Sequence, residues 1–155
     1  TAEAAVLDII VMNAGDTVLT IGGSGDSGTI AGFDVVTGMA AGDATNNSDN
    51  MNVSGTGAIV ANTAGIDGTD STLTIGGTAV KSHAIASGVV TFDDADTFSA
   101  ALTLTSAAHV AAVVQYLQVN DLGSAGDTVI FDVGSDNYLF TQGLTLLINF
   151  VCKFT

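Results

Sequence analysis

The stretch that most constrains the fold is 127–151, read as DTVIFDVGSDNYLFTQGLTLLINFV, because it alternates and then becomes almost continuously apolar. Apolar residues at every second position from Val129 to Val133 fall on one face of an extended chain, since strand side chains alternate. The GSDN segment at 134–137 has the composition of a tight turn, and 144–151 suits a strand covered on both faces. We therefore expect three antiparallel strands that form the floor of a core.

One segment upstream departs from the strand pattern and has a helical period. Four apolar residues follow the i, i+3, i+4, i+7 spacing that makes one stripe of a helix: Val110, Val113, Val114 and Leu117. Thr105 or Ser106 can cap its start with a hydroxyl group. We predict a helix at 107–118 whose apolar stripe lies on the C-terminal sheet.

The rest of the chain reads as short strands between polar, glycine-rich turns. Only 12% of the 155 residues are charged, so Thr, Ser, Asn and Gly must supply the polar surface, which favours strands over exposed helices. The predicted fold class is mainly β: an antiparallel β-sandwich or β-roll-like single domain, with one amphipathic helix packed on a C-terminal three-stranded antiparallel sheet. A division into 1–92 and 93–155 stays open. The further strands expected are 4–12, 17–21, 29–37 with a bulge at Gly32, 51–61, 72–75 and 84–92.

The sequence contains one internal echo. DTVLTIGG begins at Asp16 and DSTLTIGG begins at Asp70, and six of the eight positions are identical. Each copy precedes a second apolar segment, TIAGFDVV or HAIASGVV. The echo predicts two similar hairpins in one sandwich, with chance similarity in a low-complexity composition as the alternative.

The charge balance excludes some classes of partner. Sixteen acidic residues against two basic residues give a net charge of −14, whereas phosphate binding needs clustered Lys and Arg. Nucleic acid and anionic membrane surfaces are therefore not expected as partners. The acidity either serves solubility alone or is neutralised by divalent cations in the working state.

Oxygen-rich loops are the candidate cation sites. Alternate residues of DATNNSD, and two further Asp-containing groups, can direct carboxylate and carbonyl oxygens at Ca²⁺, which takes six to eight such ligands. The glycine-rich loop GGSGDSG at 22–28 adds one more carboxylate. The alternative for each loop is a solvated Asp-rich turn. The candidate calcium ligands are Asp26, Asp43, Thr45, Asn47, Asp49, Asp67, Asp70, Asp93, Asp94 and Asp96.

Residues that could carry catalysis are few. His83 and His109 are the only histidines, and neither lies in a recognised nucleophile pattern. His83 is expected in a strand and His109 on a partly exposed helix face. Cys152 is the single cysteine, so an internal disulfide cannot form. No apolar run is long enough for a membrane span. We expect a protein that is not an enzyme and does not insert into membranes.

Three segments carry a resemblance to a known class of proteins. GFDVVTGMAAGD…SDNMNVSGTG at 32–57, KSHAIASGVVTFDDADTFSAALT at 81–103 and GDTVIFDVGSDNYLFTQG at 126–143 resemble passages of bacterial RTX-type exported proteins, surface-layer proteins and adhesin-like proteins. The resemblance implies a secreted, cell-surface or extracellular protein, often calcium-dependent. It supplies no catalytic residues.

The function expected from these observations is structural. The chain would be a self-assembling subunit of a bacterial surface layer or filament, stabilised by calcium, with copies of itself as partners. Strand addition between subunits would use 4–12 or 144–151, the two apolar segments near the chain ends. The alternative is a calcium-dependent adhesin or ligand-binding β-sandwich module.

Overall fold

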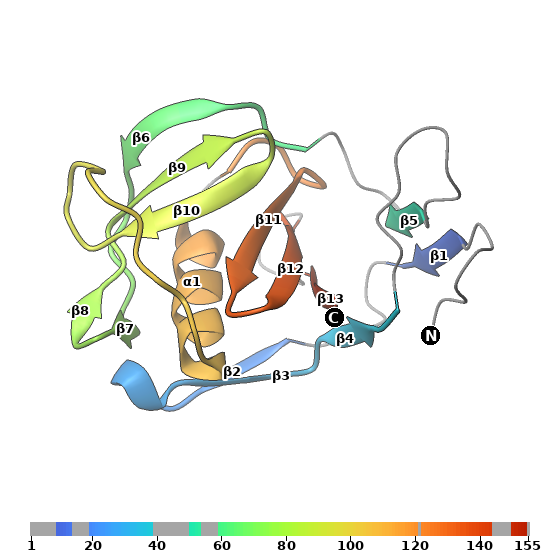
Figure 1. Ribbon diagram of the computed structural model, residues 1–155, viewed down its shortest axis with the longest axis horizontal. Helices are drawn as coiled ribbons and strands as arrows, with labels where there is room; N and C mark the ends of the chain where they lie inside the picture. The colour runs from blue at the N-terminus through green and yellow to red at the C-terminus, as the bar shows by residue number, and fades with distance from the viewer. Residues whose placement is uncertain are drawn as a thin grey trace.

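The fold was analysed in a computed structural model, which describes residues 9–13, 19–38, 50–53, 59–120, 122–143 and 150–154. Within this part of the chain the protein is mainly β with a single α-helix, α1 (Ala107–Val119), so the predicted fold class is confirmed. Figure 1 shows α1 standing between the strands, which enclose it on several sides.

Seven of the described strands form one mixed sheet. Neighbours run antiparallel, except for the β4–β13 and β10–β11 pairs, which are parallel. The sheet therefore joins elements from early and late parts of the chain. In spatial order its strands are β4 (Asp34–Val36), β13 (Phe150–Phe154), β12 (Asp136–Thr141), β11 (Thr128–Val133), β10 (Val89–Asp93), β9 (Ser82–Ala86) and β6 (Thr63–Asp67).

The predicted C-terminal antiparallel unit is confirmed as β11, β12 and β13. β11 and β12 are joined by a tight turn in which Gly134 has a φ of 63°, a left-handed conformation that favours glycine. Val129, Phe131 and Val133 are buried, as their alternation predicts. The third strand is described at Phe150–Phe154, and residues 144–149 of the predicted strand 144–151 lie outside the described part of the chain.

Helix α1 is the centre of the main core. Its bounds agree with the predicted 107–118, and the predicted stripe is buried against β11 of the C-terminal sheet. The helix also contacts β2 (Thr20–Gly22), β3 (Thr29–Ala31) and β7 (Thr74–Ile75), so strands cover it on more than one side. Its buried residues accordingly exceed one stripe: Val110, Ala111, Ala112, Val113, Val114, Tyr116 and Leu117.

A chain of aromatic contacts links the helix to the large sheet. Tyr116 packs edge-on against Phe92 of β10, and Phe92 packs edge-on against Phe131 of β11. Phe131 then stacks on Tyr138 of β12, with ring centroids 5.3 Å apart. Such pairs add to the stabilisation that comes from burying the rings alone. These aromatic contacts run from α1 across the parallel β10–β11 pair to β12.

Both copies of the internal echo lie in hairpins, but the two hairpins differ in the loop that connects the first strand to the second. β2 pairs with β3 across a loop that holds a short 3-10 helix, η1 (Gly25–Ser27). β7 pairs with β8 (Thr78–Ala79), which follows it at once, because Gly76 and Gly77 have φ values of 59° and 83° and make a two-residue turn. The second hairpin is therefore completed by β8, and the later segment HAIASGVV forms β9 and β10.

Two predicted strands are each divided in the structure. The predicted strand 84–92 is the hairpin β9–β10, because Ser87 and Gly88 both have positive φ values, 53° and 81°, and reverse the chain. The predicted strand 29–37 is interrupted at Gly32, whose φ is 82°, and continues as β4 in a different sheet.

A separate two-stranded parallel sheet lies at one end of the molecule. Its strands are β1 (Ile9–Met12) and β5 (Asn50–Val53), to the right of the main body in Figure 1. Met12, Val36 and Leu139 form a second small core beside the main one, and Ile10 and Val53 pack against it. Only the last four residues of the predicted strand 4–12 are described, and 54–58 within the predicted 51–61 are not.

Candidate functional site

The most constrained carboxylate in the described chain is Asp93, the last residue of β10. Its side chain is only 3% exposed and accepts hydrogen bonds from the N–H groups of Ala100 (3.0 Å), Ser99 (2.6 Å) and Asp94 (2.7 Å), and from the Ser99 hydroxyl. These hydrogen bonds, led by that from Ala100, hold the pKa of Asp93 well below its ordinary value. Asp93 thus fixes the loop that follows β10.

Other predicted ligands make contacts within the chain. Lys81 lies between Asp96 and Asp70, with its Nζ atom 3.1 Å and 3.9 Å from their carboxylates. The hydrogen bond and the charge of Asp96 raise the pKa of Lys81. Asp94 accepts a hydrogen bond from the Thr78 hydroxyl at 2.9 Å. In the β9–β10 region, Lys81 and Thr78 therefore already supply positive charge and a donor to these carboxylates.

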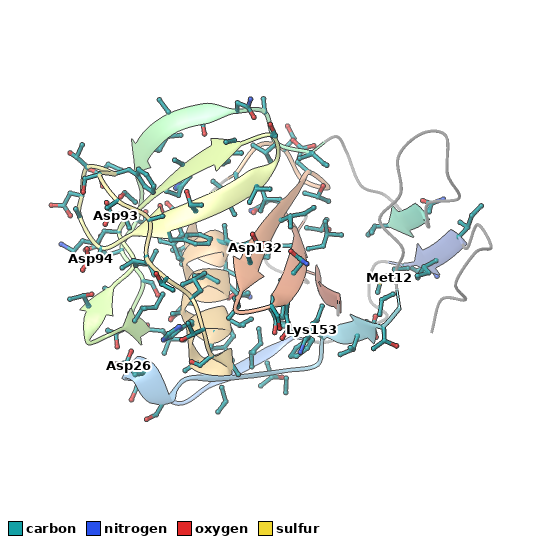
Figure 2. The ribbon with its side chains drawn as sticks, viewed as in Figure 1. Met12, Asp26, Asp93, Asp94, Asp132 and Lys153 are labelled. Atoms are coloured by element: carbon teal, nitrogen blue, oxygen red, sulfur yellow. The ribbon has the colours of Figure 1, made fainter. Side chains whose placement is uncertain are left out.

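Asp26 joins the two echo hairpins. It lies in η1, and its carboxylate accepts the backbone N–H of Gly77 in the β7–β8 turn at 3.0 Å. Figure 2 shows Asp26 at the far end of the molecule from Met12, while Asp93 and Asp94 lie together beside the β10 loop. The predicted ligands are thus spread over separate loops of the described structure.

The remaining predicted calcium ligands are one residue of β6 and four residues outside the described structure. Asp67 is the exposed last residue of β6. Four others, Asp43, Thr45, Asn47 and Asp49, lie outside the described residues. Across the ranges that the structure describes, no group of three or more His, Cys, Asp or Glu side chains is placed to hold a metal ion. Calcium binding stays a prediction for the ten candidate residues.

The two histidines have the predicted locations but different surroundings. His109 lies half-buried in the first turn of α1, where its Nδ1 accepts the N–H of Thr105 at 2.8 Å. His83 lies in β9, is 2% exposed, and its Nδ1 is 2.5 Å from the hydroxyl of Tyr116 on α1. Burial lowers the pKa of His83 and raises that of Tyr116. At neutral pH both rings are therefore uncharged.

The protonation of this pair follows from its contacts. The 2.5 Å distance fits a hydrogen bond in either direction, and we assign the Tyr116 hydroxyl as the donor because Nδ1 of His83 is its one hydrogen-bond partner among the described residues. Accepting that proton at Nδ1 leaves the imidazole proton on Nε2. The Nε2 atom is buried and has no hydrogen-bond partner among the described residues. His83 therefore presents a buried N–H donor that the fold does not satisfy.

His83 is also part of the wall of a small pocket. The pocket has a volume of about 170 Å³ and lies between the β6–β9 strands and the C-terminal end of α1. A second buried polar atom without a partner in the described chain, Oγ1 of Thr63, belongs to another of its lining residues. The lining residues are Val60, Thr63, Ile66, His83, Ile85, Asn120, Leu122 and Gly123.

Sequence reasoning did not find this pocket. Its polar residues come from β6, from β9 and from the end of α1, and no spacing in the sequence connects them. The bulge in the β6–β9 pairing, between Thr63 and Ile66, sets which side chains of β6 oppose His83 and Ile85. The one available signal was a histidine inside a strand of small and apolar residues.

The β1–β5 sheet presents an apolar surface. Ile9 and Val11 are 63% and 59% exposed, whereas Ile10 and Met12 point the other way, into or against the second core. Neither β1 nor β5 contains a charged residue. Side-chain alternation therefore leaves one face of β1 apolar and open to the solvent.

Comparisons with known proteins add no relatives: no protein-family model, curated protein or solved structure matches this chain. Of the described helical segments, none has both the length and the apolar character that crossing a membrane would require.

Proposed function

We propose that this chain is an extracellular structural protein, a self-assembling subunit of a bacterial surface layer or filament. The observation that carries the proposal is β1, an uncharged strand with apolar side chains on both faces. Ile10 and Met12 bind it to its own domain, while Ile9 and Val11 remain exposed. An exposed strand of this kind favours pairing with another chain.

The occupant that best fits this surface is a second copy of the chain. Among the described residues β1 has one strand partner, β5, and strand addition would use the other edge of β1. Growth into a layer or filament requires a heterologous contact, because a twofold contact of β1 with β1 would close at a dimer. β1 of one copy would therefore pair with a sheet edge of the next copy, and this contact would cover Ile9 and Val11.

Calcium has a definite role in this proposal. Copies that each carry a net charge of −14 repel one another, so assembly needs the charge to be neutralised. Exposed carboxylates such as Asp96 and Asp70, and the candidate loop 43–49, are the groups that a divalent cation would neutralise. The uncharged β1 surface can then make contact.

A matched pair of variants tests the proposal. Val11→Lys places a charge on the β1 surface, and Val119→Lys places the same charge at the end of α1, on a residue that is 51% exposed. With calcium present, we expect wild type and Val119→Lys to give large assemblies by light scattering and negative-stain electron microscopy. Val11→Lys should remain monomeric with an unchanged melting temperature.

Two results would contradict the proposal. One is a wild-type chain that stays a monodisperse monomer with and without calcium, which would favour the ligand-binding alternative. The other is equal assembly by the two lysine variants, because the β1 surface would then not be the interface.

A further inference from the structure

His83 is a buried imidazole that joins the large sheet to the C-terminal end of α1. Its ring packs edge-on against Tyr116 with a centroid distance of 5.6 Å, and its Nδ1 atom lies 2.5 Å from the Tyr116 hydroxyl. In the sheet, His83 pairs with Ile66 of β6 on one side and with Phe92 of β10 on the other. His83 therefore lies where three strands meet the helix.

The same end of α1 is attached to the loop that follows β6. Asn120 accepts the N–H of Thr69 at its Oδ1 atom (2.7 Å) and donates from its Nδ2 atom to the Thr69 carbonyl (3.1 Å). Gly68 lies directly on Tyr116, because a Cβ atom there would collide with the Tyr116 hydroxyl. The His83–Tyr116 contact and this loop together hold the helix end against β6 and β9.

This position suits the neutral form of the imidazole and not the protonated form. A protonated ring has two N–H donors and no acceptor, so it cannot receive the hydroxyl proton of Tyr116 at Nδ1. Its other donor, on Nε2, is sealed from solvent and has no hydrogen-bond partner among the described residues. Burying a charge beside an unmatched donor is costly, because nothing replaces the lost hydration.

The charged groups on the strands beside His83 do not compensate for this cost. On β10, the carboxylate of Asp93 accepts N–H groups of its own loop. On β6, Asp67 is exposed and pairs with Ser82 instead of His83. Burial lowers the pKa of His83, and neither carboxylate offsets this effect.

The groups on the helix and in the adjoining loops lead to the same conclusion. α1 presents the Tyr116 hydroxyl, which stays neutral because burial raises its pKa. Asp70 lies 3.9 Å from Nζ of Lys81, and Asp127 accepts the N–H of Ser124 at 2.8 Å. Among the described residues, a protonated imidazole would therefore have no counter-ion in contact with it.

We propose that the His83–Tyr116 contact is an acid-sensitive switch, which holds the end of α1 on β6 and β9 at neutral pH and releases it when the imidazole takes up a proton from the solvent. Release accompanies proton uptake because water can hydrate the charged ring only after the helix end has separated from β9. The switch consists of contacts between α1, β6 and β9, so it does not depend on the assembly proposed for β1.

The pH range of the switch follows from the two states. In the open chain His83 has the ordinary histidine pKa of about 6.5, whereas in the closed fold its pKa is lower. Above pH 6.5 both states are neutral and the closed fold keeps its full stability. Below about pH 6.5 only the open state binds the proton, so the equilibrium constant for unfolding rises by up to about tenfold per pH unit until the folded pKa is reached.

Urea denaturation of the full chain at pH 7.5, 6.5 and 5.5 tests the switch. The wild-type equilibrium constant for unfolding should rise by about fivefold to tenfold between pH 7.5 and 5.5, a range in which aspartates, with an ordinary pKa of about 3.9, stay ionised. His83→Gln keeps an uncharged side chain that can accept from Tyr116, and its constant should change by less than about twofold. His109→Gln removes the other histidine and should behave as wild type does.

NMR spectroscopy of His109→Gln gives a second measurement, which does not require His83→Gln to fold. His83 is the only histidine left in this variant, so its Cε1–H signal can be assigned without ambiguity. The signal should keep its neutral position in the folded protein down to pH 5.5 and should titrate near 6.5 in the urea-unfolded chain. Amide protection factors of Gly68 and Leu117 should fall over the same pH range.

Three results would overturn the proposal. The first is a His83 signal that titrates at pH 6.5 or above in the folded protein. The second is a His83→Gln variant with the pH dependence of wild type, and the third is a His109→Gln variant that has lost this dependence.

Discussion

Asp93 shows how one buried carboxylate can order a loop. The segment after β10 has no regular secondary structure, and its N–H groups at Asp94, Ser99 and Ala100 need acceptors. The carboxylate supplies them from a single side chain. Because hydrogen bonds to a charged group are stronger than neutral ones, the ionised form is the one that the fold favours.

We predict that Asp93→Asn lowers the free energy of unfolding by about 1–3 kcal/mol at pH 7, because an amide cannot accept all of these hydrogen bonds and carries no charge. Asp132→Asn is the matched control, since Asp132 is an exposed residue of β11 and its loss should change stability by at most about 0.5 kcal/mol. Urea denaturation of both variants measures the difference. Equal effects would show that the Asp93 carboxylate does not hold the loop.

The same residue gives a direction for the pH dependence. The pKa of Asp93 is depressed in the folded state, so its stabilisation is present above the unfolded pKa of about 3.9 and is lost as the pH falls through the folded pKa. Wild type should therefore lose stability between pH 4 and lower pH faster than Asp93→Asn does. Parallel curves for the two proteins over this range would contradict the assignment.

At the scale of elements, α1 was the part of the fold most accessible to sequence reasoning. The i, i+3, i+4, i+7 spacing located the helix to within one residue. It did not reveal that Ala111 and Ala112 are also buried, because alanine is common on exposed and buried faces alike. Their small side chains let hairpin β2–β3 approach: a Cβ at Gly28 would lie 3.3 Å from the Cβ of Ala111.

The burial of α1 on several sides makes it sensitive to cavities. We predict that Leu117→Ala lowers the free energy of unfolding by about 2–5 kcal/mol, since the side chain is fully buried between strands. Gln118→Ala, one position along on the exposed face, should change it by at most about 0.5 kcal/mol. Thermal and urea denaturation measure both. A small cost for Leu117→Ala would mean that the surrounding strands collapse onto the helix.

Short turns were the elements that sequence reasoning located least well. Ser87 and Gly88 form a dipeptide that is common in turns, but they lie inside the apolar run AIASGVV, whose pattern predicts one continuous strand instead of β9 and β10. The candidate pocket could not be predicted for a related reason. Thr63, His83 and Asn120 are brought together by sheet register and by the end of α1, which only the folded chain defines.

At the scale of the whole molecule, the net charge affects both the stability of the fold and the association of copies. Sixteen acidic residues and two basic residues leave most carboxylates without a basic partner. The salt bridges in the described part of the chain involve Lys81 and Lys153, the latter 2.7 Å from Asp136. The uncompensated repulsion destabilises the compact state and opposes association.

We predict that calcium raises the melting temperature and induces assembly beyond what ionic strength alone achieves. At a concentration of about 100 times the dissociation constant, one bound ion stabilises the fold by about 2.7 kcal/mol, which corresponds to roughly 5–10 °C for a chain of this size. Melting curves and light scattering with CaCl₂, and with NaCl at equal ionic strength, provide the measurement. Identical responses to the two salts would indicate screening without specific binding.

The parallel pairing of β4 with β13 has a consequence for how the chain acquires its fold. Asp34 pairs with Cys152, so the edge of the large sheet is completed only when segments from the two far ends of the sequence meet. Such high contact order slows folding, because loop-closure entropy is lost before the pairing is formed. During synthesis β4 can therefore take its place in this sheet only after β13 has left the ribosome.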